Sequence, residues 1–148
     1  MADSKTLLLE DNIIFLRTAI VLDDGDLVYF TLLPYSSETS IPGIGDHLKR
    51  DSTWLYRHKR SEFEELRVKR NHLRIQQDIL PMVFKEPPAM KLLWTDSGQS
   101  VALFLNGEPW AFIHEGKNHG YSKGILRPAF GNPWDRALFE KTFMRDQS

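Results

Sequence analysis

Cysteine is absent from the 148 residues of this sequence. Disulfide frameworks, thiolate zinc sites and cysteine nucleophiles are therefore excluded, and the absence fits a reducing compartment. A chain of this length buries about two-thirds of the surface that its unfolded form exposes, so it needs no crosslink to hold a core. Its apolar share of 41% is typical of a globular domain. We predict a single domain over residues 1–148.

Long hydrophobic runs are also absent. The longest apolar stretches are interrupted by Arg17, by Asp23-Asp24 or by Asn106-Gly107, far short of the ~20 residues that span a bilayer. Leu7-Leu8-Leu9 is followed at once by two acidic residues, whereas a secretory signal needs a basic start and a longer apolar segment. We expect a cytoplasmic protein with no membrane segment.

The sequence has almost no net charge, because 19 Lys and Arg residues stand against 20 Asp and Glu residues. A general nucleic-acid binder is usually strongly basic. The charges are nevertheless segregated: residues 1–46 carry two basic and eight acidic side chains, residues 47–74 carry nine and four, and residues 75–148 carry eight of each. A surface of one sign steers an oppositely charged partner even on a neutral protein, so this pattern favours association with another molecule.

Two segments have the pattern of antiparallel strands. Apolar residues 13–22 and 27–33 flank the run Asp23-Asp24-Gly25-Asp26, which predicts an N-terminal hairpin because glycine accepts the positive φ of a tight turn. Three apolar runs follow within residues 91–114, and Asn106-Gly107 joins the last two. This dipeptide favours a type I′ turn, so we predict a three-stranded antiparallel meander there.

Helices are predicted at two places. The spacing from Ser61 to Glu64 is that of a capping box, which predicts a middle helix from about residue 62 to the low seventies. Residues 66–69 also alternate as a strand would. Asn132-Pro133 predicts the start of a short C-terminal helix over residues 134–144, with asparagine as the cap and proline in the first turn.

These elements make one α+β domain. The predicted fold is a mostly antiparallel β-sheet, formed by the N-terminal hairpin and the central meander, with a middle helix and a short C-terminal helix. Residues 47–60 fit either a strand or a helix.

One motif resembles a known family. The pattern Trp94-x-Asp96-x-Gly98, followed by Val101-Ala102-Leu103-x-Leu105-Asn106-Gly107 and Gly120-Tyr121, is similar to that of a family of small bacterial domains of unknown function. Some members of that family look like immunity proteins, which neutralise secreted antibacterial toxins. The resemblance covers about 30 residues and transfers no catalytic residue. It implies a bacterial, non-enzymatic protein that binds a cognate toxin and occludes its active site.

The segregated charges offer two faces for such a partner. If the toxin is a nuclease, its positive site is matched by the acidic candidates Asp23, Asp24, Asp26, Glu38 and Asp46. If the toxin has an acidic cleft, the match is the basic candidates Arg57, Lys59, Arg60, Arg67 and Arg70. Charge complementarity would set the rate of association in either case. The opposed charges could also pair within one chain or between copies in a homo-oligomer.

Two other classes of function stay open. His114, Glu115 and His119 lie in one loop and offer imidazole and carboxylate groups for acid–base chemistry or a metal. Aromatic residues alternate with basic ones over residues 47–74, as on surfaces that bind single-stranded nucleic acid. Because a domain of this size needs its aromatic side chains for the core, we favour a protein partner over a nucleic acid. We expect no catalytic residue, metal or cofactor.

Overall fold

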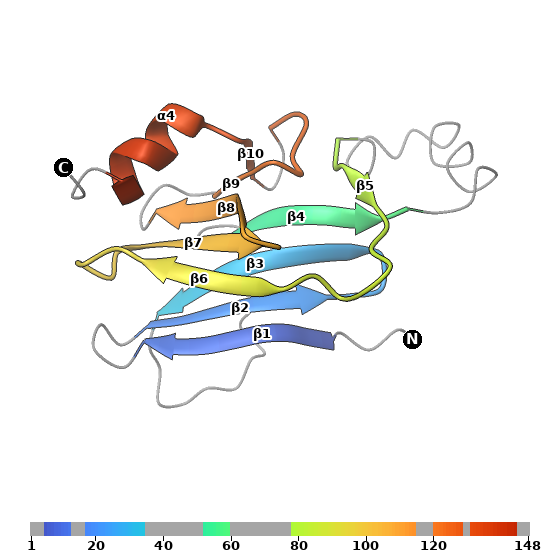
Figure 1. Cartoon of the computed structure of the whole chain (residues 1–148), viewed down its shortest axis with the longest axis horizontal. Helices are drawn as coiled ribbons and strands as arrows, with labels where there is room; N and C mark the ends of the chain where they lie inside the picture. The colour runs from blue at the N-terminus through green and yellow to red at the C-terminus, as the bar shows by residue number, and fades with distance from the viewer. Residues whose placement is uncertain are drawn as a thin grey trace.

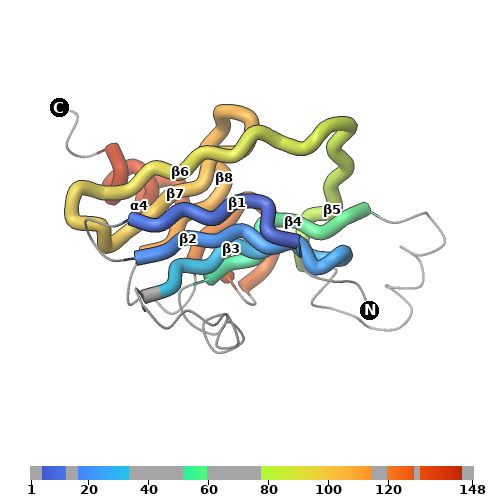
Figure 2. Tube along the Cα trace, turned by 90° about the horizontal axis from the view of Figure 1, so that it is seen from below, coloured from blue at the N-terminus to red at the C-terminus, as the bar shows by residue number. Residues whose placement is uncertain are grey.

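The computed structural model describes residues 5–12, 17–34, 52–59, 78–114, 120–128 and 131–144. Two five-stranded sheets lie face to face as two layers, and a short helix covers the outer side of one of them (Figures 1 and 2). The α+β prediction therefore holds coarsely, for a protein that is mostly β in its described part. The prediction that the N-terminal hairpin and the meander form one sheet is wrong, because they lie in different sheets. The predicted middle helix lies outside the described residues.

The first sheet has the strand order β1-β2-β3-β4-β5. Its strands are β1 (Lys5–Asn12), β2 (Arg17–Asp23), β3 (Leu27–Pro34), β4 (Ser52–His58) and β5 (Pro81–Met82). Neighbours pair antiparallel except β4 and β5, which are parallel. The pairing of β2 with β3 across the acidic turn confirms the N-terminal hairpin.

Two parts of this sheet did not follow from the sequence. Strand β1 was not predicted, because Leu7-Leu8-Leu9 shows no alternation. The structure explains why: the register with β2 shifts between Thr6 and Leu8, so Leu7 and Leu8 both pack on the core. Residues 47–60 fitted a strand or a helix, and residues 52–58 of that segment form the strand β4.

The second sheet has the strand order β10-β9-β8-β7-β6. Its strands are β6 (Met90–Trp94), β7 (Ser100–Leu105), β8 (Glu108–His114), β9 (Tyr121–Ser122) and β10 (Asn132–Pro133). The antiparallel pairs β6–β7 and β7–β8 confirm the predicted meander. Asn106 and Gly107 have φ of 50° and 81°, the positive values that a type I′ turn requires.

The start of the C-terminal helix was predicted at the wrong residues. Asn132 and Pro133 form β10, which pairs parallel with β9. The helix α4 (Arg136–Phe139) begins after Asp135, whose side chain accepts the N–H of Leu138, and it continues as the π-helical turn η2 (Glu140–Met144). Pairing with β9 takes Asn132 into a strand, and Asp135 caps the helix instead. None of the described helices is long and apolar enough to cross a membrane.

The main core lies between the two sheets. Val21, Phe30 and Leu55 from the first sheet cluster with Leu103 and Ile113 from the second, all inaccessible to solvent. A second cluster lies on the outer face of the second sheet. There Phe112 stacks on Tyr121 with ring centroids 4.9 Å apart and packs against side chains of α4 and η2.

The two layers touch most closely where β4 passes β8 and the chain that follows it. Trp110 Nε1 donates to the carbonyl of Leu55 at 2.8 Å, and the N–H of Gly120 donates to the carbonyl of Ser52 at 2.7 Å. Gly124 lies so close that a Cβ there would be 1.7 Å from the carbonyl oxygen of Leu55. This side of the molecule is therefore closed by backbone contact. On the opposite side lie the edge strands β1 and β6 (Figure 2).

Candidate functional site

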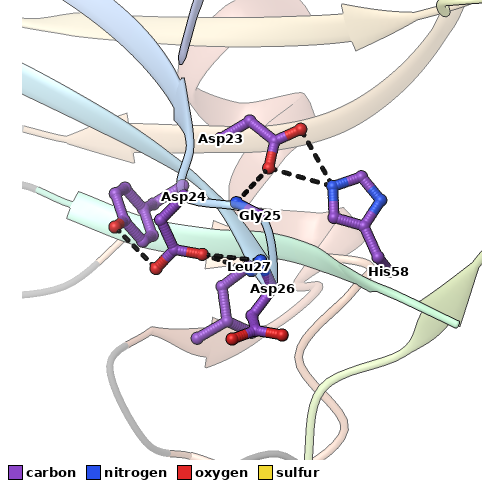
Figure 3. Close-up of polar contacts among 7 residues, drawn as sticks. Asp23, Asp24, Gly25, Asp26, Leu27 and His58 are labelled. Atoms are coloured by element: carbon purple, nitrogen blue, oxygen red, sulfur yellow. Dashed lines mark hydrogen bonds and ion pairs between the residues drawn. The ribbon is translucent and has the colours of Figure 1, made fainter. Parts of the chain in front are cut away.

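The acidic turn, residues 23–26, is held by its own carboxylates. Asp23 Oδ1 accepts the N–H of Gly25 at 2.8 Å, and Asp24 Oδ1 accepts the N–H groups of Asp26 and Leu27 at 2.8 and 2.7 Å (Figure 3). Gly25 has φ of 96°, a value that few residues other than glycine adopt. Short acidic side chains followed by glycine therefore fix the shape of the loop.

His58, at the end of β4, lies against this turn. Its Nε2 is 2.9 Å from both carboxylate oxygens of Asp23 (Figure 3). Its backbone N–H donates to the carbonyl of Asp26 at 2.9 Å. An ionised carboxylate only accepts, so Nε2 carries the proton. The side chain of His58 is 42% exposed and that of Asp23 is 18% exposed. The contact thus joins the acidic N-terminal segment to the basic segment at a partly open surface.

Two tyrosines complete this region. Tyr29 donates its hydroxyl to Asp24 Oδ2 at 3.0 Å, and Tyr56 packs edge-on against the rings of His58 and Phe84. Burial raises the pKa of each phenol from 10 to about 12, and the negative charges of the nearby aspartates add to the effect. Both phenols therefore stay neutral at physiological pH. They can hold the turn, but neither has the pKa of a general base that works near neutrality.

The acidic candidates differ in their exposure. Asp23 and Asp24 are partly buried, and their carboxylates are engaged by the backbone, by His58 and by Tyr29. Asp26 is exposed. Glu38 and Asp46 lie outside the described residues. Contact of these side chains with a partner stays a prediction.

The basic candidates are split in the same way. Arg57 is only 7% exposed, and its Nε donates to the carbonyl of Ile79 at 3.1 Å. Lys59 is exposed, and its backbone N–H donates to the carbonyl of Met82 at 3.1 Å. Arg60, Arg67 and Arg70 lie outside the described residues. A role of these residues in partner binding stays a prediction.

The histidine loop is described only at its first residue. The Nδ1 of His114 shares a hydrogen bond with the hydroxyl of Ser100, its cross-strand neighbour. Ser100 is 1% exposed, and its N–H donates to the hydroxyl of Thr95 at 3.2 Å, so the pair lies within the sheet rather than in an open cleft. Glu115 and His119 lie outside the described residues. Within the described ranges, no three His, Cys, Asp or Glu residues come together as a metal site would require.

A groove that sequence reasoning missed runs along the edge strand β6. Its volume is about 480 Å³, and it is lined by Ala89, Met90, Lys91, Leu92, Leu93, Phe104 and Gly107. Leu93 is 37% exposed, because the alternation of β6 turns it away from the core. The one available signal was a leucine at a position of the strand where a polar residue is expected. The pairing of His58 with Asp23 was also missed, since no local pattern links residues 35 positions apart.

Comparisons with models of known protein families, with curated proteins and with solved structures find no match to this chain.

Proposed function

We propose that this chain is a non-enzymatic protein that binds another protein, and that it acts as a bacterial immunity protein. It would neutralise a cognate toxin by covering the toxin's active site. The observation that supports the binding role is the surface formed by Asp26, His58 and Lys59, which we call the clasp surface. Asp26 and Lys59 are exposed, and His58 is 42% exposed in its side chain.

A rigid surface is what occlusion requires. The acidic turn is held by three carboxylate contacts to its own backbone and by the pairing of Asp23 with His58. A surface that is already ordered loses little conformational entropy when a partner binds. The clasp surface presents negatively and positively charged side chains close together. It therefore fits a protein face of mixed charge better than the uniformly negative backbone of a nucleic acid.

The buried aromatic and basic residues of β4 argue in the same direction. Tyr56 is 2% exposed, so it offers no face on which a base could stack, and Arg57 is directed to the carbonyl of Ile79. Neither residue is available for the stacking and phosphate contacts of a single-strand binder.

The test is coexpression with the product of the neighbouring gene. The proposal predicts that this product inhibits growth alone, that growth returns with the present protein, and that the two copurify. The variants Asp26→Lys and Lys59→Glu should weaken copurification. The matched reversals Asp96→Lys and Lys141→Glu, at exposed residues of the second sheet and its helix, should leave it intact. Failure to find a stable complex, or equal loss in both pairs, would contradict the proposal.

A further inference from the structure

The edge strand β6 pairs on one side only. Within the part of the chain that the structure describes, β7 is its only strand partner. Its other side therefore presents backbone groups in the geometry of a strand, which is the usual template for pairing with a further chain.

The backbone groups that point outward can be identified from the register. The N–H of Asn106 donates to the carbonyl of Ala89 at 2.8 Å, and the N–H of Thr95 donates to the carbonyl of Ser100 at 3.0 Å. Hydrogen-bonded and non-bonded pairs alternate along an antiparallel ladder. Residues 89, 91, 93 and 95 therefore bond to β7, and the N–H and C=O groups of Met90, Leu92 and Trp94 point away from it.

The side chains of β6 alternate in the same way between the core and the outer face. Met90, Leu92 and Trp94 pack on the core, whereas Lys91 and Leu93 are exposed on the outer face. Leu93 and Phe104 give the groove of about 480 Å³ an apolar wall and floor, and Lys91 is its only charged lining residue. An occupant must therefore supply extended backbone, an apolar side chain near Leu93 and no positive charge opposite Lys91.

We propose that a second copy of this chain supplies all three, by antiparallel pairing of β6 with β6 about a two-fold axis. In the register that places Leu93 opposite Leu93 of the second copy, each Leu92 lies opposite a Trp94. Those are the residues whose backbone groups point outward, so one hydrogen-bonded pair forms on each side of the leucine pair. The two exposed leucines cover each other, and each Lys91 lies opposite a Thr95.

The pairing of the two exposed leucines favours this register. Sliding one strand by two residues in one direction places Lys91 opposite Leu93 and separates the leucines, and sliding it by four in that direction places Lys91 opposite Lys91, where like charges repel. The net charge of −1 sets no long-range repulsion between two copies. Shared symmetry makes the contact self-complementary, as in most homodimers.

The contact is short, because β6 has five residues. Interfaces that bury less than about 1,200 Å² belong to the weak, transient class. We therefore expect a monomer in dilute solution and a dimer that becomes abundant at about 100 µM and above. The inference is independent of the immunity role, which concerns the clasp surface.

Sedimentation of the purified protein as a function of concentration tests the dimer. The wild type should show reversible self-association, and Leu93→Lys should abolish it by adding charge to the centre of the contact. Leu126→Lys is the matched control, because Leu126 is 52% exposed and follows β9, two strands away from β7. A wild type that stays monomeric up to about 1 mM, or a Leu93→Lys variant that still dimerises, would overturn the proposal.

The register is tested by oxidation of single cysteine variants, which is clean because the chain has no cysteine of its own. Opposed residues of a non-bonded pair have Cα atoms about 4.5 Å apart, within the range that a disulfide spans. Leu93→Cys should crosslink to a dimer at least about tenfold faster than Lys91→Cys, with Leu126→Cys giving the rate of random collision. Equal rates for all three, or faster crosslinking through Lys91→Cys, would contradict the proposed pairing.

Discussion

At the scale of single residues, the carboxylate of Asp23 makes two different contacts, one within the acidic turn and one with a distant strand. Its Oδ1 accepts the N–H of Gly25, which shapes the acidic turn, and both its oxygens contact His58 Nε2 at 2.9 Å. The first contact is local, and a sequence with Asp and Gly in a turn predicts it. The second joins strands that are distant in the sequence and depends on the register of β3 with β4.

A double-mutant cycle measures that second contact. Because the side chain of His58 is 42% exposed, solvent screens the pair and we expect a coupling energy of only about 0.5–1 kcal/mol between Asp23→Asn and His58→Gln. Chemical unfolding of the four proteins gives the value. A coupling indistinguishable from zero would mean that the pair does not hold the turn.

The two tyrosines of this region predict an alkaline loss of stability. The pKa of Tyr29 and Tyr56 is raised to about 12 in the folded protein from 10 in the unfolded chain. The folded state therefore favours the neutral phenols: their contribution is complete below pH 10 and is lost as the pH rises through 12. Ultraviolet titration should show two late ionisations. Tyr29→Phe and Tyr56→Phe should each remove one late step, and a titration curve that neither change alters would contradict this.

At the scale of elements, the close passage of β4 against residues 120–124 decides how the two sheets meet. A Cβ on Gly120 would lie 3.2 Å from the Cβ of Thr53, and one on Gly124 would lie 1.7 Å from the carbonyl oxygen of Leu55. These glycines hold backbone against backbone, which no hydrophobic pattern in the sequence reveals. The turns and the meander, by contrast, follow from Asn106-Gly107 and the alternation around it.

Gly124→Ala tests the importance of this passage. The added methyl group collides with a backbone oxygen that β4 holds in place, so we expect a loss of more than about 3 kcal/mol in the free energy of unfolding. Gly107→Ala is the control, because a Cβ there meets nothing within 4 Å and only the positive φ of 81° is strained. That change should cost about 1 kcal/mol. Thermal unfolding compares the two, and equal losses would contradict a tight approach at Gly124.

At the scale of the whole molecule, the described parts of the acidic and basic segments meet in the fold. Asp23 of the acidic turn pairs with His58 at the end of β4, and Leu27 of β3 pairs with Arg57 of β4. The segregation of charge is visible in the sequence, which also predicts the N-terminal hairpin and the three-stranded meander. It could not predict where the blocks meet, because that depends on long-range strand pairing, and for the same reason it missed the groove beside β6.

We propose that a protein partner binds the clasp surface. Amide hydrogen exchange of the chain, alone and in complex with the product of the neighbouring gene, tests this most directly. We predict that the complex slows exchange in the acidic turn and at the end of β4, around residues 23–27 and 56–59, and leaves the outer face of the second sheet unchanged. Slowing confined to the second sheet, or no slowing at all, would contradict the claim.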